Sequence, residues 1–169
     1  GWQQPVEGKW YYLNEDGTRD TTKKGSQKIG EDEYYLDEDG VPQKGMIKAD
    51  GKIVFYDETT GILKTDLNGW YKDPESGKWY WFEKGVAATG WITVEEKKYY
   101  LSEDGTMVTG WQKIDNKWYY FSDKGAMQTG WIKLDNKWYY LDPSTGVMAT
   151  GWVKVNGTWY YMNNSGVMQ

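Results

Sequence analysis

The sequence contains no cysteine and no histidine among its 169 residues. Without cysteine the chain can form neither a disulfide nor a thiolate metal site. Without histidine it lacks the commonest general base near neutral pH and the commonest metal ligand. Phenylalanine is scarce as well, with 3 residues against 12 tryptophans and 15 tyrosines. The mean hydropathy of −0.86 indicates few aliphatic residues, so a single compact core of Leu, Ile and Val is not expected.

Long apolar runs and basic clusters are also missing. No run of about 18 apolar residues occurs, so we predict no membrane insertion. The net charge is −5, and without a block of basic residues we predict no nucleic-acid partner. The chain opens with Gly1-Trp2 rather than methionine and shows no signal peptide, so we expect a mature fragment or an excised module.

Groups that could perform catalysis or hold a metal are not evident. No nucleophile–base pair can be built without histidine or cysteine, so the chain is not expected to be an enzyme and no cofactor is predicted. The acidic turn at Asp37–Gly40 does not have the spacing of an EF-hand loop, so its carboxylates are interpreted as turn residues and no metal site is predicted.

An internal repeat of about 20 residues runs along the whole chain. Glycine followed by tryptophan starts a unit at Gly90, Gly110, Gly130 and Gly151. Each unit continues with an aromatic triplet such as Trp-Tyr-Tyr, a turn that ends in glycine, and a methionine. Counting weaker copies upstream, eight units cover the sequence, and the second and third have lost both tryptophans. Such periodicity is typical of solenoids and repeat arrays.

Each unit is expected to form a β-hairpin. In the seventh unit, strands 131–134 and 137–141 flank Asp135-Asn136, and the eighth unit has Asn156-Gly157 at the same place. Asn, Asp and Gly suit tight hairpin turns, whereas Trp and Tyr favour strands over helices. We therefore predict an all-β fold in which tandem β-hairpin repeats stack as a β-solenoid.

The repeats divide by how well they keep the pattern. Residues 1–68 hold three degenerate units, and residues 69–169 hold five units close to the consensus. We expect both parts to belong to one continuous solenoid.

Side-chain alternation along the strands separates two faces in each hairpin. In the seventh unit one face carries Trp131, Lys133, Trp138 and Tyr140. Because lysine keeps its ammonium group in water, the rings on this face are expected at the solvent boundary. Aromatic rings around a small notch attract a quaternary ammonium ion, and three rings at about 0.5–2 kcal/mol each would give roughly millimolar affinity.

The opposite face is interpreted as a packing face. It includes the first tyrosine of each Tyr-Tyr pair, and these tyrosines are interpreted as core residues: Tyr99, Tyr119, Tyr139 and Tyr160.

The stretch Gly110–Trp131, GWQKIDNKWYYFSDKGAMQTGW, resembles the choline-binding repeats of Gram-positive surface proteins and phage lysins. The resemblance is specific for the fourth to eighth units and weaker for the first three. It implies a left-handed solenoid of hairpins with choline sites between consecutive units. It also implies an extracellular, non-catalytic module that attaches to phosphocholine-decorated teichoic acids of the cell wall.

The family builds each site from two tryptophans of one unit and a tyrosine of the next, often with an apolar floor. Alternation selects the second tyrosine of each pair. The choline sites implied here are Trp111 and Trp118 with Tyr140, Trp131 and Trp138 with Tyr161, Trp70 and Trp79 with Tyr100, and Trp2 and Trp10 with Tyr35, with Met127 and Met148 as floors.

Several units depart from this pattern. The fifth pairs Trp91 with Lys98, so its site with Tyr120 is expected to be lost or weak. The second and third units should lack cages, since their equivalent positions hold Ser26, Glu33, Met46 and Ile53. The rings of the last unit have no following hairpin, so that site is expected to be open, or completed by a homodimer through the C-terminal repeat.

Two other functions remain open at this point. The array could bind glucans or other carbohydrates, as related glucan-binding and clostridial-toxin repeats do, because aromatic faces also stack on sugars. Alternatively it could be a protein-interaction scaffold, with a protein partner at the divergent N-terminal repeats around residues 20–70.

Overall fold

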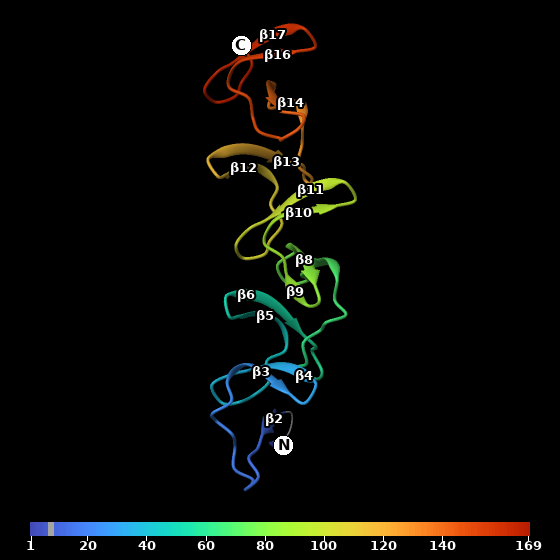
Figure 1. Ribbon diagram of the computed structural model, residues 1–169, viewed down its shortest axis with the longest axis vertical. Helices are drawn as coiled ribbons and strands as arrows, with labels where there is room; N and C mark the ends of the chain where they lie inside the picture. Colours follow the sequence, from blue (N-terminus) through green and yellow to red (C-terminus); the bar gives the residue numbers. More distant parts are fainter. Residues whose placement is uncertain (7–8) are drawn as a thin grey trace. The chain divides into compact units, whose positions relative to one another are not determined.

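A computed structural model describes residues 1–6 and 9–169, and in these ranges every regular element is a β-strand (Figure 1). Most strands pair with their neighbour in sequence as antiparallel hairpins. The predicted all-β architecture of tandem hairpins is confirmed. The strands are β1 Trp2–Val6, β2 Lys9–Tyr12, β3 Gly25–Ile29, β4 Asp32–Leu36, β5 Gly45–Ala49, β6 Lys52–Tyr56, β7 Gly69–Lys72, β8 Trp79–Glu83, β9 Val86–Ala87, β10 Gly90–Val94, β11 Lys97–Leu101, β12 Gly110–Ile114, β13 Lys117–Phe121, β14 Gly130–Leu134, β15 Lys137–Leu141, β16 Gly151–Val155 and β17 Thr158–Met162.

The chain forms two compact units. The first comprises residues 1–89 with 103–106, and the second comprises 90–102 with 107–169. The expected boundary between degenerate and consensus repeats, at residues 68 and 69, falls inside the first unit. The boundary at residues 68 and 69 therefore marks a change in sequence pattern and not a division between compact units. That the repeats form one continuous solenoid stays a prediction.

The first unit contains an irregular sheet as well as simple hairpins. Its strands run in the order β5-β6-β9-β8-β7, with the short β9 joining two hairpins through the pairs Val54–Val86 and Phe82–Ala87. Phe82 is fully buried there and packs in a cluster with Phe55 and Tyr80. This part of the chain therefore has a small conventional core.

The hairpin turns follow from their residue types. Asp115 and Asn116 have φ of 48° and 61°, and Asp135 and Asn136 repeat these values. Two successive positive φ angles are the signature of the tight turns whose twist matches a hairpin, and Asp and Asn tolerate them better than other side chains. The turn predicted at Asp135-Asn136 is confirmed.

The loops that follow the last three hairpins of the second unit each return to the hairpin before. A methionine backbone N–H in each loop donates to a backbone carbonyl of that earlier hairpin. The three bonds are Met127 to Lys98 at 2.8 Å, Met148 to Trp118 at 2.8 Å and Met168 to Trp138 at 2.9 Å. Consecutive hairpins of this unit are thereby stacked at a fixed spacing.

Each hairpin of the second unit buries the last residue of its second strand completely. The four residues with no exposed surface are Leu101, Phe121, Leu141 and Met162. They lie on the face that alternation assigned to packing. The opposite face, which carries the tryptophans, keeps more exposure: Trp118 is 41% exposed and Trp138 39%.

Candidate functional site

The tryptophans of one hairpin stand at right angles to each other. The ring centres of Trp111 and Trp118 are 6.4 Å apart with an interplanar angle of 87°, and those of Trp131 and Trp138 are 6.2 Å apart at 88°. In each hairpin the two rings come from opposite strands and the same face, as alternation predicted. The two indoles form adjoining walls of a corner that is open on one side.

A tyrosine of the next hairpin forms a third wall, and it is the first of its pair. The ring of Tyr139 lies 5.0 Å from Trp111, and that of Tyr160 lies 4.9 Å from Trp131. The expected partners were Tyr140 and Tyr161. These instead pack across their own hairpins, against Trp131 at 5.0 Å and Trp152 at 5.2 Å respectively.

This pairing of rings has a simple physical reason. The tryptophan face of one hairpin is covered by the packing face of the next, so the closing tyrosine must come from that packing face. Tyr119, Tyr139 and Tyr160 therefore line the tryptophan corners, and the interpretation of these tyrosines as core residues alone was incomplete.

The rings of the sixth unit enclose a defined cleft of about 330 Å³. Its lining comprises Trp111, Trp118, Tyr139, Met148, Asn164 and Ser165. Trp118 keeps 41% of its surface exposed, so the indole is accessible to a ligand. Met148, expected as a floor, belongs to this lining.

Sequence reasoning missed one residue of the next corner. Met168 donates its backbone N–H to Trp138 in the way that Met148 donates to Trp118. By analogy with Met148, it is the candidate floor residue for the corner of Trp131, Trp138 and Tyr160. The methionine near the end of each of the last four units, at Met107, Met127, Met148 and Met168, was the available signal.

The chain matches two known families of repeats. The model described as "Choline-binding repeat" matches residues 23–66, 88–113 and 108–150, which is more than half of the chain. A second model, "Putative cell wall binding repeat", matches residues 1–18, 68–85 and 150–168. The chain belongs to the choline-binding repeat family.

Solved structures with choline-binding repeats are similar over nearly the whole chain. CbpJ from Streptococcus pneumoniae is 37% identical with a TM-score of 0.73, over 95% of this chain and 56% of that structure. Choline binding protein F from the same organism is 36% identical with a TM-score of 0.71, over 99% of this chain and 58% of that structure. The chain thus spans little more than half the length of either structure.

Two streptococcal enzymes are also similar over part of the chain. Glucosyltransferase-I of Streptococcus downei is 34% identical over 91 residues, which is 52% of this chain and 5% of the enzyme. Glucosyltransferase-S of Streptococcus mutans is 36% identical over 92 residues, 53% of this chain and 6% of the enzyme. The similarity therefore covers a small part of these enzymes.

The fourth choline-binding repeat keeps a tryptophan corner despite its longer spacing. Trp70 and Trp79 are 6.4 Å apart at 88°, as in the consensus repeats. Lys72 pairs directly with Trp79 across the hairpin, so the additional residues are accommodated in the turn at 73–78. The expected third member, Tyr100, lies in the other compact unit, 5.2 Å from Trp91. Its role beside Trp70 and Trp79 stays a prediction.

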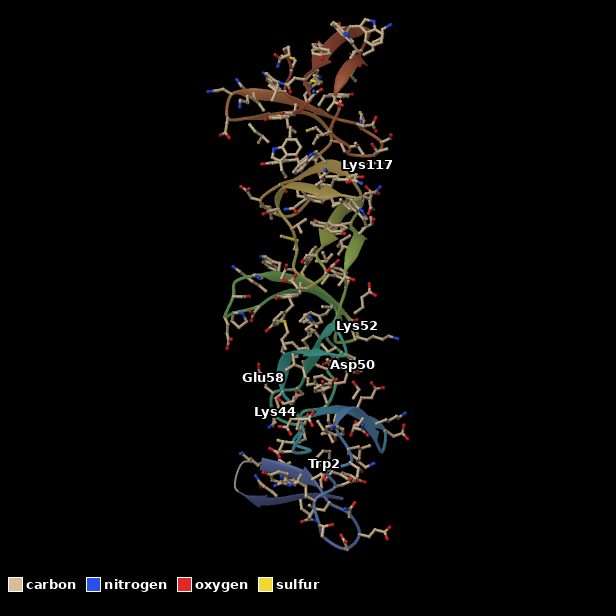
Figure 2. All side chains as sticks on the ribbon, turned by 90° about the vertical axis from the view of Figure 1, so that its left-hand side faces the viewer. Trp2, Lys44, Asp50, Lys52, Glu58 and Lys117 are labelled. Carbon is tan, nitrogen blue, oxygen red and sulfur yellow. The ribbon has the colours of Figure 1, made fainter. Side chains whose placement is uncertain are left out.

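The first choline-binding repeat follows the same rule for its tyrosine. Trp2, labelled in Figure 2, lies 4.9 Å from Tyr34, the first tyrosine of the next hairpin. The expected Tyr35 instead packs 6.5 Å from Tyr56. Trp10 is 46% exposed, an exposure similar to that of Trp118 and Trp138.

The second and third repeats hold other contacts in place of ring corners. Met46 and Ile53 pack against the cluster around Phe55. Ser26 donates a hydrogen bond of 2.5 Å to Asp50. The absence of tryptophan therefore coincides with apolar packing in one repeat and a polar contact in the other.

The fifth repeat keeps its cleft but changes its chemistry. Trp91 lies 5.0 Å from Tyr119, whereas the expected Tyr120 packs 5.1 Å from Trp111 within its own hairpin. Lys98 occupies the position of the second tryptophan, and the cleft measures about 370 Å³.

The last repeat presents its rings to solvent. Trp152 is 68% exposed, Trp159 58% and Tyr161 41%. The expectation of an open site is consistent with these values, and completion by a second copy stays a prediction.

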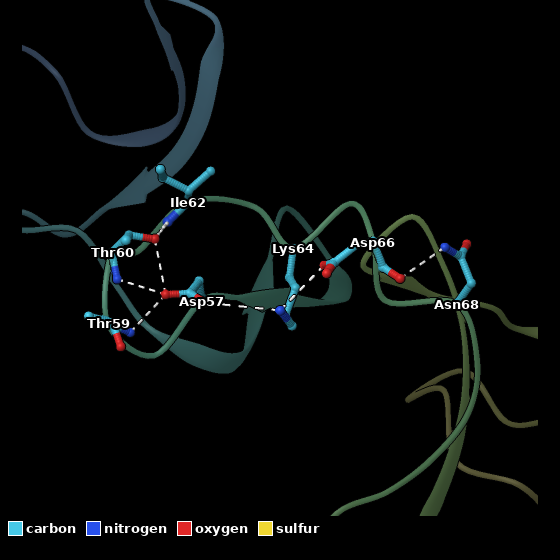
Figure 3. Close-up of polar contacts among 7 residues, drawn as sticks. All are labelled: Asp57, Thr59, Thr60, Ile62, Lys64, Asp66 and Asn68. Atoms are coloured by element: carbon cyan, nitrogen blue, oxygen red, sulfur yellow. Dashed lines mark hydrogen bonds and ion pairs between the residues drawn. The ribbon is translucent and has the colours of Figure 1, made fainter.

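Acidic residues shape the loops between repeats rather than a metal site. In the loop after β6, Asp57 accepts the backbone N–H groups of Thr59 and Thr60 at 2.9 and 2.8 Å, while Lys64 bridges Asp57 and Asp66 (Figure 3). Across the described ranges no group of three or more acidic side chains lies close enough together to hold a metal ion. Nor does that part of the chain contain a helix with the length and hydropathy needed to cross a bilayer.

One of these loops carries a strongly shifted carboxyl group. Asp142 accepts the hydroxyl and backbone N–H groups of Ser144 and Thr145. The hydroxyl bonds, chiefly that of Ser144, lower the pKa of Asp142 to about 2. This loop carries Ser144 and Thr145 to the edge of the cleft beside Trp91.

Proposed function

We propose that this chain is a non-catalytic cell-wall-binding module whose clefts hold the choline groups of phosphocholine-decorated teichoic acids. The observation that carries the proposal is the three-ring corner, formed by two perpendicular tryptophans and a tyrosine from the next hairpin. Membership of the choline-binding repeat family supports it. The module acts at the cell surface, outside the cell.

The chemistry of the corner fits a quaternary ammonium ion. Its methyl groups cannot accept or donate hydrogen bonds, so it loses little on leaving water, and the π faces of indole and phenol attract its charge. The cleft beside Trp111 offers ring faces and a methionine, while its polar lining consists of the neutral Asn164 and Ser165. Nothing in this lining requires a hydrogen-bonding ligand.

The proposed choline sites lie in four repeats that keep both tryptophans of the hairpin. Trp111, Trp118, Tyr139 and Met148 form one, and Trp131, Trp138, Tyr160 and Met168 form another. Trp70 with Trp79, and Trp2 with Trp10 and Tyr34, are proposed as further ring sets.

Isothermal titration calorimetry with choline tests the proposal. We expect saturable binding in the millimolar range, and a loss of one site when Trp131 is replaced by alanine. Dextran and maltose serve as matched ligands that offer sugar faces without a cation. Saturable binding of either sugar with no response to choline would contradict the proposal.

Carbohydrate binding is the second candidate, because the chain is similar to parts of two glucosyltransferases. Aromatic walls also stack on sugars, but sugar recognition usually adds hydrogen bonds from polar groups. The same titrations with dextran and maltose decide between the two.

Two further partners are proposed besides choline, one at each end of the chain. The exposed rings of the last repeat are proposed to contact a second copy, giving a homodimer. The divergent N-terminal repeats are proposed to contact another protein. Sedimentation velocity at two concentrations tests the first proposal, and deletion of the divergent repeats in a wall-binding assay tests the second.

A further inference from the structure

The six positions that line the cleft of the sixth repeat also line the cleft of the fifth, and all but one keep a similar kind of residue. Tryptophan, tyrosine and methionine recur as Trp91, Tyr119 and Met127. The loop residues Ser144 and Thr145 stand where Asn164 and Ser165 stand in the sixth. The exception is Lys98, which replaces an indole. The fold therefore preserves the cleft while one wall changes from a ring to a cation.

A second lysine faces the same cleft. Lys117, at the start of β13 (Figure 2), lines it together with Lys98. Within the described residues, this lining contains no carboxylate, and neither lysine belongs to an ion pair of the described part of the chain. Ser144 and Thr145 have their hydroxyls directed to Asp142. Two lysine side chains thus line one cleft of about 370 Å³.

Two like charges at a cleft favour an anion and disfavour a cation. Lysine is a common phosphate ligand that acts as a point charge, and the faces of Trp91 and Tyr119, inclined at 70° to each other, can stack on the carbon skeleton of a sugar or polyol. We propose that the fifth cleft binds a phosphate ester of a sugar or polyol, with the phosphate between Lys98 and Lys117, and that it excludes quaternary ammonium ions. This proposal rests on the geometry of this cleft and does not depend on choline binding elsewhere.

The phosphate could belong to a polymer or arrive as a free anion, so the test compares three probes. Glucose 6-phosphate, glucose and inorganic phosphate are titrated into the full chain, with ³¹P line widths and calorimetry as readouts. We expect saturable binding of glucose 6-phosphate, weaker binding of inorganic phosphate and none of glucose, with affinity falling as salt rises. Equal affinity for inorganic phosphate would overturn the role of the rings, and no binding of glucose 6-phosphate would overturn the site.

Lysine variants locate the binding. Lys98→Met and Lys117→Met should each weaken glucose 6-phosphate binding roughly tenfold, since each removes a charged hydrogen bond. Lys137→Met is the matched control, because Lys137 starts β15 as Lys117 starts β13 but does not line the cleft of its neighbour. An unchanged affinity in Lys98→Met, or an equal loss in Lys137→Met, would overturn the proposal.

A restoring substitution separates this inference from the proposed function. Lys98→Trp recreates the ring corner of the sixth repeat, so it should abolish phosphate binding and add one bound choline per chain. If the unsubstituted chain bound no choline but still bound glucose 6-phosphate through Lys98, the fifth cleft would stand and the choline proposal would fall. Persistence of phosphate binding in Lys98→Trp would overturn the assignment to Lys98.

Discussion

At the scale of the residue, the closing tyrosine is expected to act through its ring rather than its hydroxyl. Tyr139 contributes one wall beside Trp111 at 5.0 Å, and a phenyl ring offers a π face of similar strength. We predict that Tyr139→Phe leaves choline affinity within about twofold, whereas Tyr139→Ala weakens one site by roughly tenfold. Site-resolved NMR titration of the indole N–H signals measures both.

Comparable large losses in the two variants would indicate that the hydroxyl recognises the ligand, as expected for a sugar. Tyr139→Phe keeps the packing of the ring in place, so it also controls for disruption of the hairpin. A loss in Tyr139→Ala alone would assign the effect to the aromatic face.

The methionine beneath each cleft is fixed by a glycine of the following loop. Gly146 has φ of 76°, and a Cβ placed there would come within 2.6 Å of the Met127 sulfur. Gly130 has a similar φ of 74° but nothing within 4 Å of its Cβ position. The two glycines share a backbone conformation, but they differ in the free space around the Cβ position.

We therefore predict that both Gly→Ala variants are destabilised, and Gly146→Ala more so. Left-handed backbone costs alanine about 1–2 kcal/mol, and displacement of Met127 should add about 1 kcal/mol more. Urea unfolding measures the difference. Equal destabilisation of the two variants would show that Met127 is not held by this contact.

At the scale of the element, the Asp142 loop should keep its carboxylate hydrogen bonds to a lower pH than a loop held by a carboxyl group of ordinary pKa. Because its folded pKa is lowered to about 2, the contribution of the carboxylate is complete above the ordinary pKa near 3.8. It is lost as pH falls through about 2. We predict that NMR titration of the Asp142 carboxyl carbon reports this low pKa, and that loop signals shift in the same range.

Asparagine provides a matched control, since Asn163 holds the equivalent loop of the last repeat through bonds to Ser165 and Val167. Asp142→Asn should keep the loop and remove its acid transition. An ordinary carboxyl pKa near 3.8 in the unsubstituted chain would contradict the hydrogen-bonding account.

Much of the hairpin could be predicted from the sequence, because its rules are local. Side-chain alternation placed Trp111 and Trp118 on one face, and Asp135-Asn136 marked a turn that needs positive φ. The closing tyrosine could not be predicted this way, because alternation within one hairpin does not specify which face of the next hairpin covers it. Only the stacking shows that Tyr139, and not Tyr140, reaches Trp111.

At the scale of the whole molecule, weak sites become useful through number. A single three-ring site gives roughly millimolar affinity, but sites tethered on one chain can raise avidity about 10²–10⁴-fold on a polyvalent surface. We predict that binding to a choline-decorated surface is far tighter than binding to free choline. Trp111→Ala and Trp131→Ala together should lower surface affinity by more than the product of the single effects.

Surface plasmon resonance on choline-coated and bare dextran surfaces measures this avidity, with free choline as competitor. Retention on bare dextran that choline does not displace would instead indicate carbohydrate recognition. A surface affinity equal to that for free choline would show that the sites act singly.

The central claim is that stacked indole and phenol rings hold a methylated ammonium group. The most direct measurement is the number of choline molecules bound per chain by calorimetry, in the unsubstituted chain and in Trp131→Ala. The account predicts saturable binding and a decrease of one site in the variant. The same number of sites in both proteins, or no saturable binding in either, would contradict it.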